Sequence, residues 1–226
     1  MFQHTLSRLK LAQHFVAILR DTSQTDRVFE LVEGVSRDPE IGAKYPPMTA
    51  EVDFAREPFE QGFPDLDALR AMPEDSFGRA LAAHMDSLGV DFSAFDRKPT
   101  PESDYEWLER HGYETHDIWH VVTGWGTGPT NELGLQGFYF GQLDHIKAAT
   151  LIMLGLMRGF IGGREEMVGI FEAIVAGWQQ GRQSKQLWGV DWRLHFERPL
   201  AEVRAEFEIQ AVDSAAFTEI DEKLAA

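Results

Sequence analysis

The stretch His116-Asp117-Ile118-Trp119-His120 is followed by eleven residues and then by Glu132. In an α-helix each residue advances by about 100° around the axis, so side chains four positions apart return to nearly the same direction. His120 would then lie between the directions of His116 and Asp117, and all three would share an arc of about 100°. The pattern predicts a helix that presents one metal-binding face.

The connection between this helix and Glu132 is rich in residues that permit sharp turns. It contains Gly124, Gly126, Gly128 and Pro129, so the chain can double back and bring Glu132 to the same point. Two imidazoles and two carboxylates would then converge. This donor set suits zinc or another divalent first-row metal, with a water molecule completing an open site. The predicted metal ligands are His116, Asp117, His120 and Glu132.

The same residues also permit other interpretations. On an exposed helix the two histidines would simply be solvated, Asp117 would cap the helix or pair with His120, and Glu132 would face water. The likeness to the metalloprotease H-E-x-x-H motif is superficial, because Asp117 is one methylene shorter than the glutamate that acts there as general base. An HD-type phosphohydrolase would add His84 and Asp144 as ligands and would give His120 no role. Taken alone, His84 is expected to be a packed or surface residue.

The composition describes an acidic, cysteine-free chain that can form a sizeable core. Of its 226 residues 43% are hydrophobic and 12% aromatic, and the formal net charge is −16. Such a chain lacks the basic surface that binds nucleic acids or anionic lipids, so we expect no nucleic-acid partner and only apolar contacts with a membrane. Without cysteine, any metal must be bound by His, Asp and Glu. Residues 1–226 are expected to form a single domain.

Neither a signal peptide nor a membrane span is predicted. Residues 1–20 carry histidines and basic residues through the part where a signal peptide is apolar. The longest apolar run, residues 148–157, is shorter than the roughly 20 residues that cross a bilayer. These features favour a soluble, cytoplasmic protein.

Hydrophobic spacing predicts helices and gives strands little support. Residues 37–64 contain prolines throughout and no sustained period, so a long proline-rich loop is expected there. No alternating apolar and polar run of a strand's length lies between turn signals, so the predicted fold class is all-α. The predicted helices cover residues 6–19, 28–35 (capped by Asp26), 66–72, 77–88 (capped by Ser76), the segment from the Ser103–Glu106 capping box to the motif, 167–178, and a last helix with Pro199 as its first residue.

The segment Leu133–Gly163, directly after the motif, is apolar and unusually rich in glycine and alanine. Glycine in a helix costs about 1 kcal/mol relative to alanine, so this density indicates close backbone approach, either to another helix or to a ligand. The amphipathic helix over residues 167–178 follows, and its apolar stripe is expected to lie in the core.

The motif and its surroundings resemble a known family over roughly residues 65–210. His116-Asp117-x-x-His120-x11-Glu132 is similar to the HDxxH-x11-E signature of the fourth protein of the coenzyme Q (ubiquinone) biosynthesis series. Further blocks that resemble that family are Leu69-x-x-Met72-Pro73-x-x-Ser76-Phe77-Gly78, His120-Val121-Val122-Thr123-Gly124, Trp188-Gly189-Val190-Asp191-Trp192 and Pro199-Leu200-x-x-Val203-Arg204.

The resemblance implies a helical, membrane-associated protein that binds zinc or another divalent metal and acts on a prenylated quinone-ring precursor. It implies that His116, Asp117, His120 and Glu132 hold the metal, and that the chain is either an organiser of the biosynthetic complex or the enzyme for oxidative decarboxylation at ring carbon one. Other ubiquinone-biosynthesis proteins, a second copy of the chain and the inner face of the cell membrane are the expected partners. The chain departs from the family at Asn131 and over Gln136–Tyr139, so the resemblance leaves open which substrate or partner this member serves.

Two functional hypotheses follow from these features. In the first, the chain is an enzyme with Asp117 and Glu132 as catalytic residues, and Asp117 is the ligand that loosens and carries a proton. In the second, the metal is structural and residues 134–178 enclose an isoprenoid tail, so the chain is a scaffold of the biosynthetic complex. Arg158 or Arg164 would bind a polar or phosphate head group. Zinc does no redox chemistry, so an oxidative step would require another metal or direct reaction of the substrate with oxygen.

Overall fold

A computed structural model describes residues 2–20, 25–36, 38–44, 65–89, 101–143 and 145–225 of the chain. Within these ranges the regular structure is helical, and the one β-type pairing is an isolated bridge between Ser76 and Pro199. The predicted all-α fold class is confirmed. The helices are α1 (Phe2–Arg20), α2 (Thr25–Ser36), α3 (Pro39–Gly42), α5 (Leu66–Arg70), α6 (Phe77–Leu88), α7 (Asp104–Glu114), α8 (His116–Thr123), α9 (Pro129–Gln142), α10 (Ile146–Gly162), α11 (Arg164–Gln183), a 3-10 turn (Trp192–Leu194), α12 (Leu200–Glu206) and α13 (Ala215–Ala225).

Polar side chains begin three helices where the sequence predicts it. Asp65, Ser76 and Ser103 each accept a hydrogen bond from the backbone amide three residues ahead, and they begin α5, α6 and α7. Such a bond satisfies one of the amides that a helix leaves without an internal partner. The Glu106 carboxylate reaches back to the amide of Glu102 rather than to that of Ser103, so the predicted capping box closes one residue early.

Some boundaries differ from the prediction. α2 begins at Thr25, ahead of the predicted cap Asp26, and Pro199 precedes α12 rather than serving as its first residue. A short helix, α3, lies inside the predicted loop 37–64 and is capped by Asp38; residues 37 and 45–64 of that loop lie outside the described residues. Helix α13 is not predicted by the hydrophobic pattern at all.

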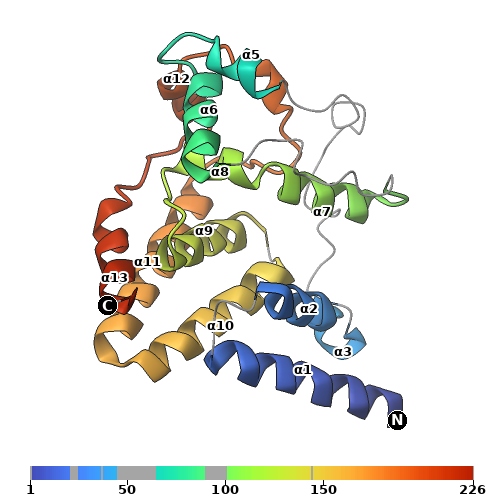
Figure 1. The fold of residues 1–226 in the computed structure, drawn as a ribbon. Helices are drawn as coiled ribbons and strands as arrows, with labels where there is room; N and C mark the ends of the chain where they lie inside the picture. Colours follow the sequence, from blue (N-terminus) through green and yellow to red (C-terminus); the bar gives the residue numbers. More distant parts are fainter. Residues whose placement is uncertain are drawn as a thin grey trace.

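The helices form layers around a large apolar core. Figure 1 shows α5, α6 and α12 at one end, then α7 and α8, then α9 and α11, and finally α10 with α1, α2 and α3 at the other end. The core joins Phe77 of α6, Trp119 of α8, Phe138 of α9 and the tryptophans Trp188 and Trp192, all of them buried. A smaller cluster ties α1 and α2 to α10. The motif helix α8 therefore lies between the end layer and the central helix pair.

The glycines of the segment after the motif serve helix packing. A side-chain carbon added at Gly177 of α11 would lie 1.8 Å from the carbonyl oxygen of Gly134 in α9, and one added at Gly137 would lie 2.3 Å from the carbonyl oxygen of Ile174. At these glycines, the backbones of α9 and α11 thus approach too closely to accommodate a side chain. Of the two interpretations of this segment, helix packing accounts for these positions, and no space remains there for a lipid tail.

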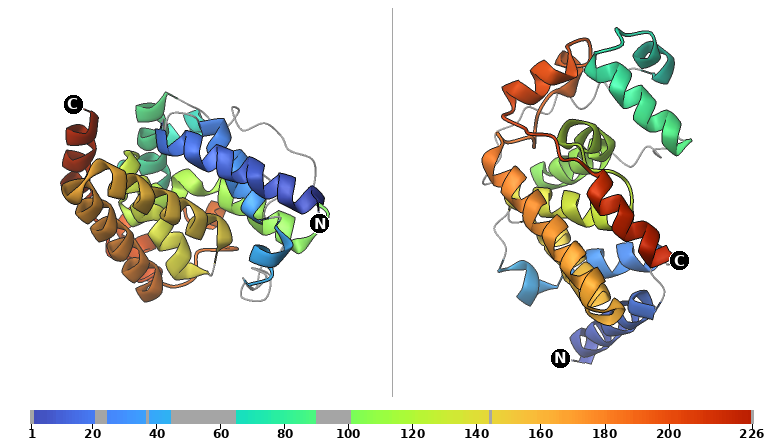
Figure 2. Two further views of the ribbon diagram at one scale, coloured as in Figure 1. Left: turned by 90° about the horizontal axis from the view of Figure 1, so that it is seen from below. Right: turned by 90° about the vertical axis from the view of Figure 1, so that its left-hand side faces the viewer.

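The C-terminal helix packs against the two central helices. Figure 2 shows α13 lying beside α9 and α11, where Phe217 packs against Trp125 with ring centroids 5.1 Å apart. None of the helices in the described ranges is sufficiently long and apolar to cross a membrane.

Candidate metal centre

Helix α8 is anchored in the core by the apolar residues between and after its histidines. Ile118, Trp119 and Val122 are fully buried, and the Trp119 ring stacks on the Tyr139 ring at 4.2 Å. Gly124 ends the helix with a φ of 86°, a backbone conformation that suits glycine because it has no Cβ. These contacts fix the rotation of α8, so its polar face has a defined direction.

Two long side chains hold the C-terminal end of α8 and the turn that follows. Arg204 of α12 donates to the carbonyls of Val121 and Val122 at 2.8 and 3.0 Å. Buried Gln180 of α11 donates to the carbonyl of Thr123 and accepts from the indole N–H of Trp125 at 3.0 Å. These bonds satisfy carbonyls that the helix end leaves unpaired and hold the Trp125 backbone in place.

Helix α9, which carries Glu132, begins at Pro129 and is capped from a distant part of the chain. The N-cap position is Gly128, which has no side chain to accept a hydrogen bond. Asp221 of α13 accepts from the amide of Thr130 at 2.8 Å in its place. A carboxylate at a helix N-terminus is favourable because the free amides and the helix dipole are positive there. Glu132 is thus positioned by a helix almost ninety residues further along the chain.

His116, His120 and Glu132 converge on one point. The Nε2 atoms of the two histidines lie 3.2 Å apart. The carboxylate oxygens of Glu132 lie 3.2 Å from His120 Nε2 and 3.5 Å from His116 Nε2. Each residue offers one ligand atom, and the three atoms lie within 4.8 Å of one another. The predicted approach of Glu132 to the motif face is therefore present in the structure.

The other ring nitrogen of each histidine already has a partner. His120 Nδ1 donates to the carbonyl of Trp125 at 3.0 Å. His116 Nδ1 lies 3.2 Å from the Tyr139 hydroxyl, which itself lies 3.4 Å from the carbonyl of Gly112 and donates to it. Tyr139 can then only accept from His116, so both neutral imidazoles carry hydrogen on Nδ1 and a lone pair on Nε2.

These features fit a divalent metal ion. Two ligands at about 2.0–2.1 Å from one tetrahedral ion are about 3.3 Å apart, which matches the separations of 3.2–3.5 Å in this cluster. Three atoms with lone pairs facing one another would repel unless a proton or a cation lies between them. Histidine ligands whose second nitrogen donates to a carbonyl or a hydroxyl are the usual arrangement around protein-bound metals.

The electrostatics of the cluster keep Glu132 ionised. Burial raises the pKa of the Glu132 carboxyl, but in the metal-free chain the adjacent His116 and His120, which donate to Glu132 only when they carry an additional proton on Nε2, outweigh burial and lower this pKa to about 2. Burial also raises the pKa of Tyr139 well above its ordinary value, and the nearby carboxylates Glu132 and Asp117 add to this effect. The phenol therefore stays protonated and remains a hydrogen-bonding group of the site.

Access to the cluster is one-sided. The His120 side chain is 1% exposed, whereas those of His116 and Glu132 are 33% and 37% exposed. A ligand that completes the coordination of an ion can therefore enter beside His116 and Glu132, while the core closes the side of His120.

Asp117 is not one of the three converging ligands. Its Oδ1 lies 3.2 Å from Nε2 of His84 on α6, and both side chains are largely buried. Burial raises the pKa of Asp117, but the bond to His84 and the nearby imidazoles lower it below its ordinary value. Ligation by Asp117 stays a prediction. His84 is packed, as expected, and Asp144, its partner in the phosphohydrolase alternative, lies outside the described residues.

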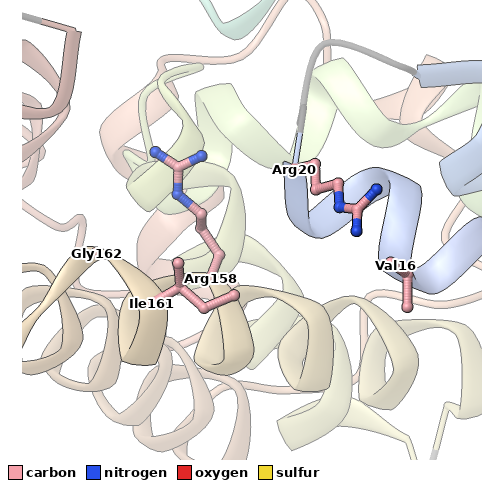
Figure 3. A pocket seen from close by; sticks show the side chains of 5 residues that line it. All are labelled: Val16, Arg20, Arg158, Ile161 and Gly162. Carbon is pink, nitrogen blue, oxygen red and sulfur yellow. The ribbon is translucent and has the colours of Figure 1, made fainter.

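The two predicted substrate-binding arginines lie away from the cluster. Arg158 of α10 lines an open pocket of about 560 Å³ together with Val16 and Arg20 of α1, Ile161 and Gly162. Figure 3 shows the guanidinium groups of Arg158 and Arg20 on the two sides of this pocket. Arg158 is fixed through Nε to buried Glu166 at 3.0 Å. Arg164, the first residue of α11, is exposed and is not part of this pocket.

The sequence did not indicate several residues that shape the cluster. Tyr139 lies within the segment where the chain departs from the family pattern, and that departure was its only signal. His84 was indicated only as a ligand in the phosphohydrolase alternative, and not as a partner of Asp117. Gln180 and Asp221 carried none, because a capping or bridging residue 55 or 91 positions from its partner leaves no local pattern.

The fold and the site together define an all-α protein with a two-histidine, one-glutamate candidate metal centre. The family described as "Coenzyme Q (ubiquinone) biosynthesis protein Coq4" matches residues 56–213. The chain belongs to this family, as the motif predicted.

Relatives in the comparison are fungal and cyanobacterial. The chain is 32% identical over 148 residues to the mitochondrial ubiquinone biosynthesis protein coq4 of Aspergillus flavus, covering 64% of this chain and 50% of the relative. It is 30% identical over 149 residues to that of Talaromyces stipitatus, covering 65% and 50%. The chain thus spans about half the length of these relatives. The crystal structure of a protein from Nostoc punctiforme described as a ubiquinone biosynthesis protein has the same fold, with 23% identity, a TM-score of 0.65 and coverage of 88% of this chain and 97% of that one.

Proposed function

We propose that the chain is a metal-dependent enzyme of ubiquinone biosynthesis that supports oxidative decarboxylation of a prenylated ring precursor at ring carbon one. The observation that carries the proposal is the convergence of His116 Nε2, His120 Nε2 and a Glu132 carboxylate oxygen, with both Nδ1 atoms already bonded elsewhere. Membership of the Coq4 family and the names of the relatives supply the substrate class.

His116, His120 and Glu132 are the residues that would hold the metal. A bound divalent metal polarises an oxygen of the substrate and stabilises negative charge that develops beside it. Two histidines and one carboxylate with open positions are also the donor set of non-haem iron(II) oxygenases, so iron would supply an oxidative step that zinc would not. The exposed edges of His116 and Glu132 leave room for the carboxylated ring.

Asp117 is the proposed proton acceptor. Its pKa is lowered, so the carboxylate is ionised near neutral pH and can take a proton from a hydroxyl of the bound ring. Glu132 has a pKa lowered to about 2 and two histidine partners, which suits a permanent ligand. In this proposal, Asp117 is the residue that exchanges protons and Glu132 is the residue that stays bound.

The pocket between α1 and α10 is the proposed site for an anionic group of the substrate or of another isoprenoid lipid. Arg20 and Arg158 supply two positive charges, and Val16 and Ile161 supply an apolar wall. The bond from Arg158 Nε to Glu166 orients the guanidinium, which lowers the entropy lost when its terminal nitrogens bind an anion. Arg164, at the end of the same helical hairpin, would add charge at the surface.

Exposed apolar side chains on α10 and α11 are the proposed contact with a membrane surface, with other ubiquinone-biosynthesis proteins or with a second copy of the chain. Phe160 is 74% exposed, Ile161 58% and Phe171 54%. Contact through such side chains would be apolar and only weakly dependent on salt. The inner face of the cell membrane stays the predicted location; the fungal relatives are named mitochondrial.

Metal binding is tested by loading the purified chain with iron(II) without oxygen, and separately with zinc, manganese and cobalt, followed by elemental analysis and chelator competition. We expect one ion per chain and a loss of at least about 100-fold in affinity for His120→Ala and Glu132→Gln, because each removes a direct ligand. Glu202→Gln, which removes an exposed carboxylate of α12, is the control and should bind as the native chain does. Absence of binding by the native chain for all four metals would refute the proposal.

The reaction is tested in cells that lack their own Coq4 protein. The native chain should restore ubiquinone. Asp117→Asn should keep the fold and, at saturating metal concentration, the bound ion, but it should abolish ubiquinone and accumulate the carboxylated ring precursor. Retained ubiquinone production in Asp117→Asn would contradict the proposed role of Asp117. Binding of a prenyl diphosphate, followed by tryptophan fluorescence, should weaken about tenfold in Arg158→Gln and not in Arg182→Gln, an exposed arginine of α11.

A further inference from the structure

His84 links helix α6 to two residues of the motif on α8. Its Nε2 lies 3.2 Å from Oδ1 of Asp117, and its ring is stacked on the ring of His120 with centroids 5.5 Å apart and an angle of 23°. Asp117 and His120 are three positions apart on α8, so they lie on the same face of the helix. One side chain from a different helix therefore contacts both a ligand of the proposed metal and the acidic residue beside it.

The bond between His84 and Asp117 has a defined direction. A carboxylate near neutral pH only accepts hydrogen bonds, so His84 must donate its Nε2 hydrogen. The side chains are 14% and 15% exposed, so water competes weakly for either partner. The bond therefore restrains the Asp117 carboxylate to one orientation and occupies one of its two oxygens.

We propose that His84 is a positioning residue of the metal site, which holds Oδ1 of Asp117, so that only Oδ2 of Asp117 serves the site. The inference rests on the proposed metal binding. It deepens that proposal because His84 lies outside the motif. Carboxylates and histidines around protein-bound metals commonly depend on such partners, and loss of one costs about 10–100-fold in metal affinity or activity.

Direct ligation by His84 is a different arrangement that the geometry does not favour. The three converging ligand atoms belong to His116, His120 and Glu132, while Nε2 of His84 is engaged by Asp117. The parallel stacking of His84 on His120 also places the two rings face to face rather than with their nitrogens directed at one point. His84 thus acts through Asp117 and not on the ion itself.

Two substitutions separate the contacts that His84 makes. His84→Phe keeps a flat ring for the stack on His120 and removes the donor, and His84→Gln keeps an N–H donor near Nε2 and removes the ring. Cobalt(II) affinity by chelator competition should fall about 10–100-fold in His84→Phe and stay within about threefold of native in His84→Gln. A second variant without a donor, His84→Leu, should behave as His84→Phe does. Unchanged affinity in His84→Phe, or equal losses in His84→Phe and His84→Gln, would overturn the inference.

A double-mutant cycle with Asp117→Ala tests whether His84 acts through Asp117. In the Asp117→Ala chain, His84→Phe should change cobalt affinity by less than about threefold, because its hydrogen-bond partner is already gone. A full loss in that background would overturn the inference. The visible absorption of bound cobalt should keep its native intensity in His84→Phe, whereas His116→Ala, which loses an imidazole ligand, should change it. If the native chain binds no metal, the proposed function fails; if it binds metal and only the His84 results differ, this inference fails alone.

Discussion

The substitution Gly177→Ala tests whether α9 and α11 are packed as closely as the structure shows. The added methyl carbon would lie 1.8 Å from the carbonyl oxygen of Gly134 and 2.9 Å from the amide nitrogen of Phe138. Both are backbone atoms of α9, which cannot rotate away. An ordinary contact at 3.4 Å requires the two helices to separate locally by about 1.6 Å.

The expected loss of stability follows from two opposing effects. Alanine is favoured over glycine within a helix by about 1 kcal/mol. Overpacking a core costs about 1–3 kcal/mol, and a clash with backbone belongs at the upper end of that range. The net effect is a destabilisation of about 2 kcal/mol, which lowers the unfolding temperature of a chain of this size by about 4–8 °C.

The same displacement should reach the metal site. Glu132 lies two residues before Gly134 on α9, and metal ligands tolerate errors of only about 0.2 Å. Gly177→Ala should therefore also weaken metal binding, even though residue 177 does not contact the cluster. A chain in which α9 and α11 separate without moving Glu132 would lose stability and retain its metal affinity.

Thermal unfolding and chelator competition measure the two effects. Gly169→Ala is the matched control on the same helix, because the nearest atoms to its methyl carbon belong to the Ile220 side chain, with Cδ1 at 2.4 Å, and not to a helix backbone. The control should change the unfolding temperature by at most about 2–4 °C in either direction and leave metal affinity unchanged. Gly177→Ala with native stability and native affinity would refute the close packing on which the positioning of Glu132 depends.

Three further predictions concern residues around the cluster. Tyr139→Phe removes the acceptor of His116 Nδ1 and should weaken metal binding about tenfold, measured by chelator competition; an unchanged affinity would argue against the tautomer assigned to His116. Burial lowers the pKa of His111 from 6.5 to about 4, so protonation favours the unfolded chain, and about 3 kcal/mol of stability, complete above about pH 6.5, is lost as pH falls towards 4. Urea unfolding across this range should show a flatter pH dependence for His111→Gln than for the native chain, and identical slopes would contradict this. Asp221→Ala removes the cap on Thr130 and should cost about 1 kcal/mol, whereas Asp221→Asn, which keeps an oxygen acceptor, should lose less; equal losses in a thermal scan would count against the cap.

The fold class and the three converging ligands were predictable because they depend on local patterns. Helical periods and caps such as Ser76 are read within one turn of the chain. The i, i+4 spacing of His116 and His120 fixes their common face on any helix. Glu132 was predicted from the glycines between, which permit the chain to reverse. Where the prediction relied on a turn signal alone, as at Asp26 and Pro199, the boundary was misplaced by a residue or more.

The rest depends on contacts between distant segments, which one sequence does not reveal. The sequence makes the glycines of α9 consistent with a ligand groove, but in the structure the backbone of α11 fills the space beside them. The partner of Asp117 could not be deduced, because His84 lies 33 residues away and belongs to a helix whose apolar stripe predicts only burial. The same holds for Asp221, whose role depends on where α13 packs.

The different contacts of Glu132 and Asp117 support the different roles proposed for these two carboxylates. Glu132 faces two histidines whose other nitrogens are fixed by a carbonyl and a hydroxyl, so displacement of its carboxylate would leave two lone pairs opposed. Asp117 has an alternative partner in His84, so its second oxygen can be engaged or released without leaving the carboxylate unpaired. A carboxylate that exchanges protons during a reaction needs an oxygen that can change partners. A carboxylate that retains a metal needs both oxygens held in place. The HDxxH pattern supplies only Asp117 from α8, whereas Glu132 reaches the same face from α9 and His84 reaches Asp117 from α6, so the proposed difference between the two carboxylates depends on the fold.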